Sequence, residues 1–218
     1  MALDLRDCCA LTHLPASIGG CRRLAHLYLG GCTSLRRLPE GLAACTKLKA
    51  LDAGGCEKLL DLPGSIGGCR KLTDLRLSKC TSLERLPGSI GGCSQLKRLY
   101  LDACVSLQEL PDSISGCSAL EELSVIDCAA LPRLPETLGG CAQLQKVYLR
   151  GCADSLLRKL PPLPCLAELD HMTASCAADD VVFGCKIAIK SIQPQWKAAS
   201  PEVRRIIEEH LESAQEKA

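Results

Sequence analysis

Residues 96–119, LKRLYLDACVSLQELPDSISGCSA, decide the fold, because the same pattern occurs before and after them at a fixed interval of 24 positions. Written generally, the unit is LxxLxLxxCxxLxxLPxx[IL]xxCxx. Its first position is occupied by Leu24, Leu48, Leu72, Leu96, Leu120 and Leu144. A regular period of about 20–50 residues is typical of a chain built from stacked structural repeats.

The spacing within LxxLxL changes from three to two, which places its second and third leucines on one face of a short strand. After the cysteine, Leu35, Leu38 and Leu42 turn inward, and Pro39 limits the return arm to an extended or single-turn path. Glycines in links such as SIGGC are predicted to give the tight bends of the convex side. No unit can bury its apolar face alone, so neighbouring units must stack into one core.

The LxxLxLxxC core is the signature of a leucine-rich repeat. It predicts an α/β fold, a right-handed leucine-rich repeat solenoid with a parallel β-sheet on its concave face. We expect the solenoid, with about seven repeats and a closing repeat, over residues 1–170 and a C-terminal capping segment over 171–192. A linker and an amphipathic helix follow over 193–218, where the helix either covers the last repeat or is offered to a neighbouring subunit.

The cysteines indicate buried free thiols rather than a disulfide framework. Of the 17 cysteines, 14 fall into two series with the 24-residue period, one beginning at Cys8 and the other at Cys21. Both series occupy positions that face the predicted interior, where a thiol packs as a small apolar group and donates weakly to a carbonyl. Close pairs of the CxxC kind, which metal sites require, do not occur in these series. A reducing compartment is implied.

Charge and hydropathy exclude several classes of partner. The chain has 26 Lys and Arg against 25 Asp and Glu, so it has no basic footprint for nucleic acid or an anionic membrane. Asp4 and Asp7 stand where a signal peptide needs an apolar run, and no apolar stretch is long enough to span a bilayer. We expect an intracellular protein, cytoplasmic in the first place, with an organelle as the alternative.

The outward positions of the predicted strands are the candidate partner-binding surface. The central column contains Tyr28, Tyr100 and Tyr148, which are all the tyrosines of the chain. Tyrosine and arginine are enriched at binding hot spots, although tyrosine also favours strands, where neighbouring side chains cover one another. The predicted partner-binding residues are Tyr28, Tyr100, Tyr148, Arg76, Arg98, Asp52, Asp74, Asp102, Glu122, Lys146 and Arg150.

Catalysis finds no support in the sequence. The four histidines, His13, His26, His171 and His210, lie in different predicted elements, and the motifs GxSxG, HExxH and GxxxxGK[ST] are absent. We therefore predict a protein that is not an enzyme and that has no cofactor and no metal.

The repeat text LxxLxLxxCxxLxxLPxxI resembles the leucine-rich repeats of plant nucleotide-binding disease-resistance proteins, especially those with a Toll-like domain. Residues 157–170, LRKLPPLPCLAELD, resemble the closing repeat of that group. The resemblance implies that a ligand or partner is sensed through the concave face. It does not extend to receptor activity, because the sequence shows no P-loop and no Toll-like module, and the series from Cys21 stands where that group usually has leucine.

The sequence thus predicts a non-enzymatic module that binds a protein partner on its concave face. The chain begins inside a predicted strand, so either it is a piece of a longer protein or another chain covers this N-terminal edge, around Leu3, Leu5, Cys8, Leu11 and Leu14. The C-terminal helix is the other candidate for a secondary contact. The alternative is a structural accessory subunit built permanently into a large assembly, such as an organellar or ciliary complex. Nucleic-acid binding and a membrane span are not expected.

Overall fold

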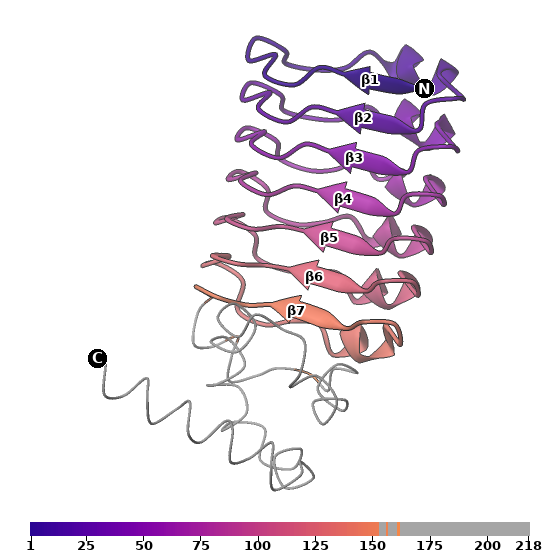
Figure 1. Cartoon of the computed structure of the whole chain (residues 1–218). Coiled ribbons are helices and arrows are strands. Elements are labelled where there is room, and N and C mark those ends of the chain that lie inside the picture. Colours follow the sequence, from indigo (N-terminus) through magenta and orange to yellow (C-terminus); the bar gives the residue numbers. More distant parts are fainter. Residues whose placement is uncertain (153–155, 157–160, 162–218) are drawn as a thin grey trace, which may run out of the picture.

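The computed structural model describes residues 1–152, 156 and 161. Its seven strands form one parallel sheet in the order β1-β2-β3-β4-β5-β6-β7, stacked like the rungs of a ladder (Figure 1). The strands are β1 (Ala2–Asp4), β2 (His26–Tyr28), β3 (Ala50–Asp52), β4 (Asp74–Arg76), β5 (Arg98–Tyr100), β6 (Glu122–Ser124) and β7 (Lys146–Tyr148). The predicted leucine-rich repeat solenoid is confirmed.

The register of the sheet follows the sequence period directly. Each strand residue pairs with the residue 24 positions later, as Leu51 does with Leu75 and Leu75 with Leu99. The middle residue of each of these strands is fully buried, whereas its two neighbours face outward. One face of the sheet is therefore core and the other is open.

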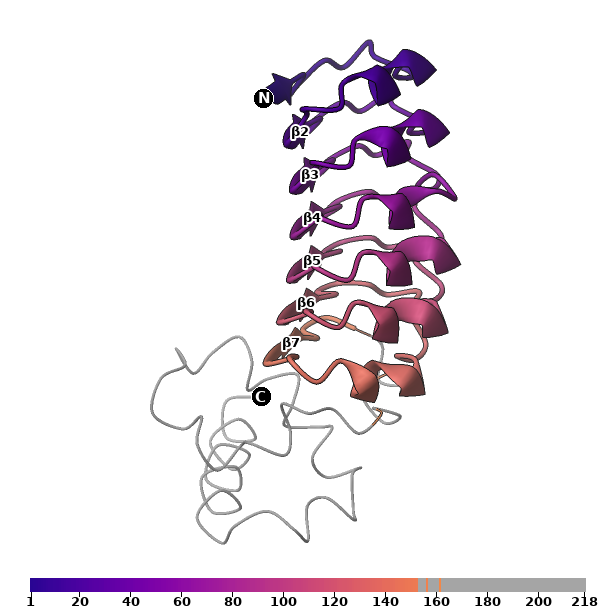
Figure 2. The same cartoon turned by 90° about the vertical axis from the view of Figure 1, so that its right-hand side faces the viewer.

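The return arms form six short 3-10 helices stacked behind the sheet, on the opposite side of the molecule from the strands (Figure 2). They are η1 (Ala16–Gly20), η2 (Glu40–Ala44), η3 (Ile66–Gly68), η4 (Gly88–Gly92), η5 (Asp112–Gly116) and η6 (Glu136–Gly140). All except η3 begin directly after a proline in an extended conformation, such as Pro39 with φ −75° and ψ 147°. The single-turn path expected from the proline is thus a 3-10 turn.

Buried thiols tie each coil to the one before it. Cys56 Sγ donates to Leu29 O at 3.2 Å, and Cys80 Sγ donates to Ala53 O at 3.2 Å, in both cases 27 residues back. The same bond is made by Cys32, Cys45, Cys69, Cys93, Cys104, Cys117, Cys128, Cys141 and Cys152. All these thiols are buried and free, as predicted.

Two cysteines depart from the prediction that both series face the interior. Cys8 is exposed and Cys21 is only half-buried. Both lie in the coil of β1, the edge strand of the described sheet. The same coil leaves Leu3, Leu5 and Leu11 only partly buried against the core.

The convex glycines do not act as predicted. None of the glycine pairs in the SIGGC links has a positive φ. Instead, a Cβ at Gly91 would collide with the carbonyl oxygen of Ser113 in the next coil, and one at Gly92 would lie 2.7 Å from Gly67 O in the preceding coil. These glycines allow close packing of neighbouring coils rather than a bend in the chain.

A left-handed residue follows every strand at the third position after its end. The seven residues and their φ angles are Asp7 (59°), Gly31 (76°), Gly55 (73°), Lys79 (64°), Ala103 (57°), Asp127 (58°) and Gly151 (71°). For a residue with a Cβ this conformation costs about 1–2 kcal/mol. Lys79 and Ala103 therefore carry a local backbone strain that glycine would relieve, whereas aspartate is among the few residue types that tolerate this conformation.

Several predictions fall on residues outside the described part of the chain. These are the closing repeat, the capping segment 171–192, the helix of 193–218 and the thiol Cys165. Among the residues that the structure does describe, no helix is long and apolar enough to cross a membrane.

Candidate functional site

The open face of the sheet carries the predicted partner-binding residues in columns that run across the strands. The first column includes Asp74, Arg98, Glu122 and Lys146, which are consecutive register partners. The second column consists of Asp4, Tyr28, Asp52, Arg76, Tyr100, Ser124 and Tyr148. The face is polar because the middle residues of the strands point into the core.

Ion pairs join neighbouring strands in the first column. Arg98 Nε donates to Asp74 Oδ1 between β4 and β5, and Lys146 Nζ lies 2.9 Å from Glu122 Oε1 between β6 and β7. The carboxylates are the more protected partners, with side chains 16% exposed at Asp74 and 22% at Glu122. These four predicted contact residues therefore already have partners within the sheet.

Tyr100 is held on two sides. Its hydroxyl donates to Glu122 Oε2 at 2.8 Å, and the Arg76 guanidinium lies 5.8 Å from its ring centroid. Burial, reinforced by the hydrogen bond to Glu122 and the charge of that carboxylate, raises the pKa of Tyr100 to about 12. Tyr100 thus stays a neutral donor throughout the physiological pH range.

The same contacts keep the two carboxylates ionised. At Asp74 burial works against the charge, but hydrogen bonds from Arg98 and Thr73 outweigh it and lower the pKa. At Glu122 the hydrogen bond from Lys146 is the largest cause of a lowered pKa, and Tyr100 adds to it against the effect of burial. Both remain negatively charged at neutral pH.

Asp102 lies two residues after the end of β5 and is hydrogen-bonded to both neighbouring coils. Its carboxylate accepts hydrogen bonds from Ser78 Oγ at 3.2 Å, from Ser124 Oγ and from Ile126 N at 3.2 Å. Ser124 is only 3% exposed, so this network satisfies a buried hydroxyl. Asp102 therefore links three successive coils in addition to any contact with a partner.

A hollow lies over β2, β3 and β4 on the same face. It has a volume of about 230 Å³ and is lined by Tyr28, Ala50, Leu51, Asp52, Asp74 and Arg76. The Tyr28 ring stacks on His26, with centroids 6.2 Å apart, and the Arg6 guanidinium lies 5.5 Å from its centroid. Asp52 accepts a hydrogen bond from Gly54 N at 3.0 Å.

Tyr148 and Arg150 belong to the last described coil. Tyr148 ends β7, where it is the register partner of Ser124 and is half-buried. Arg150 follows it on the exposed surface, and its backbone carbonyl accepts a bond from Asp127 N at 2.7 Å. Both lie on the predicted face.

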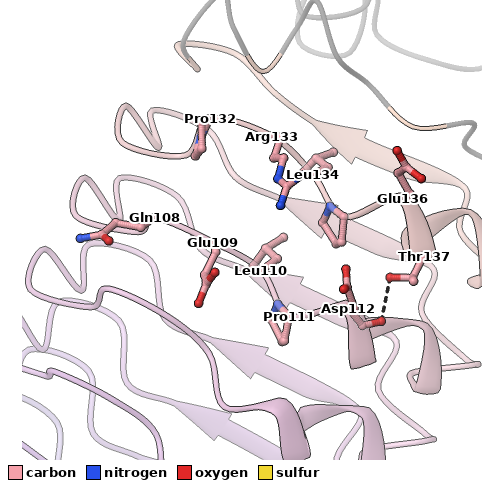
Figure 3. A pocket seen from close by; sticks show the side chains of 11 residues that line it. Gln108, Glu109, Leu110, Pro111, Asp112, Pro132, Arg133, Leu134, Glu136 and Thr137 are labelled. Carbon is pink, nitrogen blue, oxygen red and sulfur yellow. Dashed lines mark hydrogen bonds between the residues drawn. The ribbon is translucent and has the colours of Figure 1, made fainter.

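A larger groove, not predicted from the sequence, separates two return arms. It has a volume of about 710 Å³ and lies between residues 108–112 and 132–137 (Figure 3). Thr137 Oγ1 donates to Asp112 O at 2.7 Å across one end of it. The groove carries side chains of both signs, including Glu109, Arg133 and Glu136.

Pro132 is the residue that could have revealed this groove. In the preceding coil, Gln108 N donates to Glu84 O at 2.8 Å, and Leu60 N makes the equivalent bond to Arg36 O at 3.1 Å. Pro132 occupies the next equivalent position and has no N–H, so it cannot donate to the carbonyl of Gln108. The coils that contain Gln108 and Pro132 therefore lack this backbone hydrogen bond at the groove.

Side chains that could hold a metal ion do not gather in the described part of the chain. Within residues 1–152, 156 and 161 there is no group of three His, Cys, Asp or Glu side chains that could hold a metal ion. The histidines His13 and His26 lie in different coils, where His13 contacts Thr12 Oγ1 at 3.0 Å and His26 stacks on Tyr28.

No protein-family model and no curated protein matches the sequence. Similar solved structures include the leucine-rich repeat domain of the type III effector XopL, which is 23% identical over 75% of this chain and 74% of that chain, with a TM-score of 0.47.

Two plant receptors are also similar. The ectodomain of GASSHO1/SCHENGEN3 from Arabidopsis thaliana, in complex with CASPARIAN STRIP INTEGRITY FACTOR 2, is 24% identical over 69% of this chain, with a TM-score of 0.46. The Arabidopsis receptor kinase HAESA, in complex with the peptide hormone IDA and the co-receptor SERK1, is 22% identical over 73% of this chain, with a TM-score of 0.46. This chain spans only 19% and 28% of those two chains, and what they bind is a property of those proteins.

Proposed function

We propose that the chain is a non-enzymatic interaction module that binds a protein partner on the open face of its sheet. The supporting observation is the face itself, which spans seven strands and carries aromatic, acidic and basic side chains in register. At a spacing of about 4.8 Å, seven strands extend roughly 30 Å, which is wide enough for a protein surface or an extended segment. Tyrosine and arginine on such a surface are typical anchors.

The resemblance to the repeats of plant disease-resistance proteins supports partner sensing of this kind, whereas immune-receptor activity is not part of the proposal. The fourteen free cysteines in the described part of the chain support a reducing compartment, because an oxidising one would favour disulfides. Nothing in the described residues favours the alternative of a permanent accessory subunit. The N-terminal edge around Leu3 and the C-terminal helix stay predicted secondary contacts.

Affinity purification with matched variants tests the proposal. The double variant Tyr100→Ala with Arg76→Ala removes two side chains of the face, and Lys47→Ala with Lys71→Ala removes two exposed charges away from it. We expect partner recovery to fall at least tenfold for the first and to stay unchanged for the second, with the circular dichroism of both intact. Equal recovery from the two variants would refute the proposal.

A further inference from the structure

The open face is divided into a self-paired part and an unpaired part. Over β4 to β7, Asp74 pairs with Arg98, and Glu122 pairs with both Lys146 and Tyr100. Over β2 to β4, by contrast, no described residue hydrogen-bonds the Tyr28 hydroxyl or forms an ion pair with Asp52. A partner that docks on the self-paired part must compete with these ion pairs and hydrogen bonds. In the unpaired part, the Tyr28 hydroxyl and the Asp52 carboxylate can bind a partner without breaking an ion pair.

Asp52 and Arg76 are the charged groups of this part that form no ion pair with a described residue. They are register partners on neighbouring strands, yet no ion pair joins them. Arg76 is turned toward the Tyr100 ring on β5, and Asp52 accepts a hydrogen bond from Gly54 N through Oδ1, which leaves Oδ2 without a donor. Opposite charges thus stand on neighbouring strands with no ion pair between them.

The hollow lies where these groups meet. Ala50 and Leu51 on β3 line it, between Tyr28 on β2 and Arg76 on β4. Its volume of about 230 Å³ is below the roughly 300–1,000 Å³ that is usual for small-molecule sites. It therefore suits one side chain of a larger partner.

The charges favour a basic side chain in the hollow. Asp52 and Asp74 both line it, and the aromatic ring of Tyr28 lines it as well. Of these two carboxylates, Asp74 already pairs with Arg98, whereas Asp52 forms no ion pair with a described residue. The Arg6 guanidinium over the same ring shows that the ring accepts a cation. Arg76 is exposed, so its guanidinium can donate hydrogen bonds to an acidic group of the partner that lies next to the partner's basic side chain.

Resting on the proposed function, we infer that the hollow over β2 to β4 is the specificity site of the open face. It takes a lysine or arginine side chain of a partner polypeptide at Asp52 and an adjacent acidic side chain at Arg76. The segment crosses the strands in one direction, and the order of its two charges then follows the order of Asp52 and Arg76 across the sheet.

Selection from a phage-displayed library of random twelve-residue peptides tests the inference with three forms of the chain as bait. The first is the unmodified chain. The second exchanges the two charges, Asp52→Arg with Arg76→Asp, and keeps the net charge. The third is the matched control, Lys97→Glu with Glu121→Lys, which reverses an ion pair outside the predicted partner-binding residues and also keeps the net charge.

We expect the unmodified chain to enrich peptides with a basic and an acidic residue in one order, the exchanged chain to enrich the reverse order, and the control to enrich the original order. An enriched peptide is expected to bind the exchanged chain at least about tenfold more weakly. The neutral variants Asp52→Asn and Arg76→Gln replace the exchange if it does not fold, and each is expected to lose the preference for one charge.

Enrichment of the same order by all three baits, peptides without a charge pattern, or no enrichment would overturn the inference. These results leave the proposed function standing as long as partner recovery in the purification depends on Tyr100 and Arg76. Recovery that is independent of both side chains overturns the proposed function instead.

Discussion

The left-handed position after each strand shows most simply how single residues tune this fold. The chain needs a positive φ there in all seven described coils, but only Gly31, Gly55 and Gly151 are glycines. Lys79 and Ala103 adopt the same backbone at a cost that glycine would not have. The sequence period places these residues at one position of the unit, but it does not reveal the conformation, because the side chains that occupy it have little in common.

Opposite substitutions at this position are expected to have opposite effects. Gly55→Ala introduces a Cβ whose nearest neighbour is Gly31 N at 3.5 Å, so it strains the backbone without a clash and is expected to destabilise the chain by about 1 kcal/mol. Ala103→Gly relieves the strain and is expected to stabilise it by up to about 1 kcal/mol. Urea denaturation measures both changes.

Gly30→Ala is the control for this pair. Gly30 has no positive φ, and a Cβ there would lie 3.5 Å from Gly54 O, which is an ordinary contact. We expect the urea midpoint of Gly30→Ala to stay close to that of the unmodified chain. A stabilised Gly55→Ala or a destabilised Ala103→Gly would show that the turn is not left-handed in solution.

At the scale of the strands, the period predicted which residues face outward but not how they pair. Tyr100, Arg98 and Glu122 were expected as contacts for a partner, and in the structure they contact Glu122, Asp74 and Lys146 respectively. Such pairing depends on the side-chain conformations of neighbouring coils, which a repeat pattern does not contain. For the same reason the unpaired state of Asp52 and Arg76 could be seen only in the structure.

The contact between β5 and β6 gives Tyr100 a distinctive titration. With Glu122 in place, the pKa of Tyr100 is raised to about 12. The stability that the Tyr100 hydroxyl contributes is therefore fully present below its ordinary pKa near 10 and is lost as the pH rises through about 12. Glu122→Gln removes the nearby charge and is expected to lower this pKa, although burial keeps it above the ordinary value.

Absorbance near 295 nm measures this titration, and the chain has only three tyrosines to distinguish. Tyr100→Phe identifies the component that belongs to Tyr100. An unchanged late component in Glu122→Gln would show that the hydroxyl does not meet this carboxylate in solution.

For the molecule as a whole, the sequence predicted the solenoid, its parallel sheet and its inward thiols because all three follow from one period. It did not predict the groove at Pro132, where the coil has no N–H to donate to the carbonyl of Gln108 in the preceding coil. It also did not predict that Cys8 is exposed, since exposure depends on whether a neighbouring coil is present rather than on the repeat text.

Because each coil contacts chiefly its neighbours, the array is expected to tolerate the loss of one whole unit. Removal of residues 73–96 joins Leu72 to Lys97 and keeps the LxxLxL spacing, so this chain is expected to keep its circular dichroism and to unfold at a lower urea concentration. Removal of residues 73–84 takes out half a period and is expected to abolish cooperative unfolding. Equal behaviour of the two deletions would contradict a repeat-by-repeat core.

The natural cysteines test the central claim, that side chains recurring every 24 residues share one interior. The native chain is exposed to a short pulse of iodoacetamide at pH 8, and the labelled cysteines are identified by peptide mass spectrometry. We expect Cys8 and Cys9, which are exposed, to be labelled rapidly. The eleven buried thiols are expected to stay unlabelled until urea is added, because burial shields them and raises their pKa, to about 12 at Cys104 and about 11 at Cys93. Labelling of these eleven as fast as Cys8 would contradict the account.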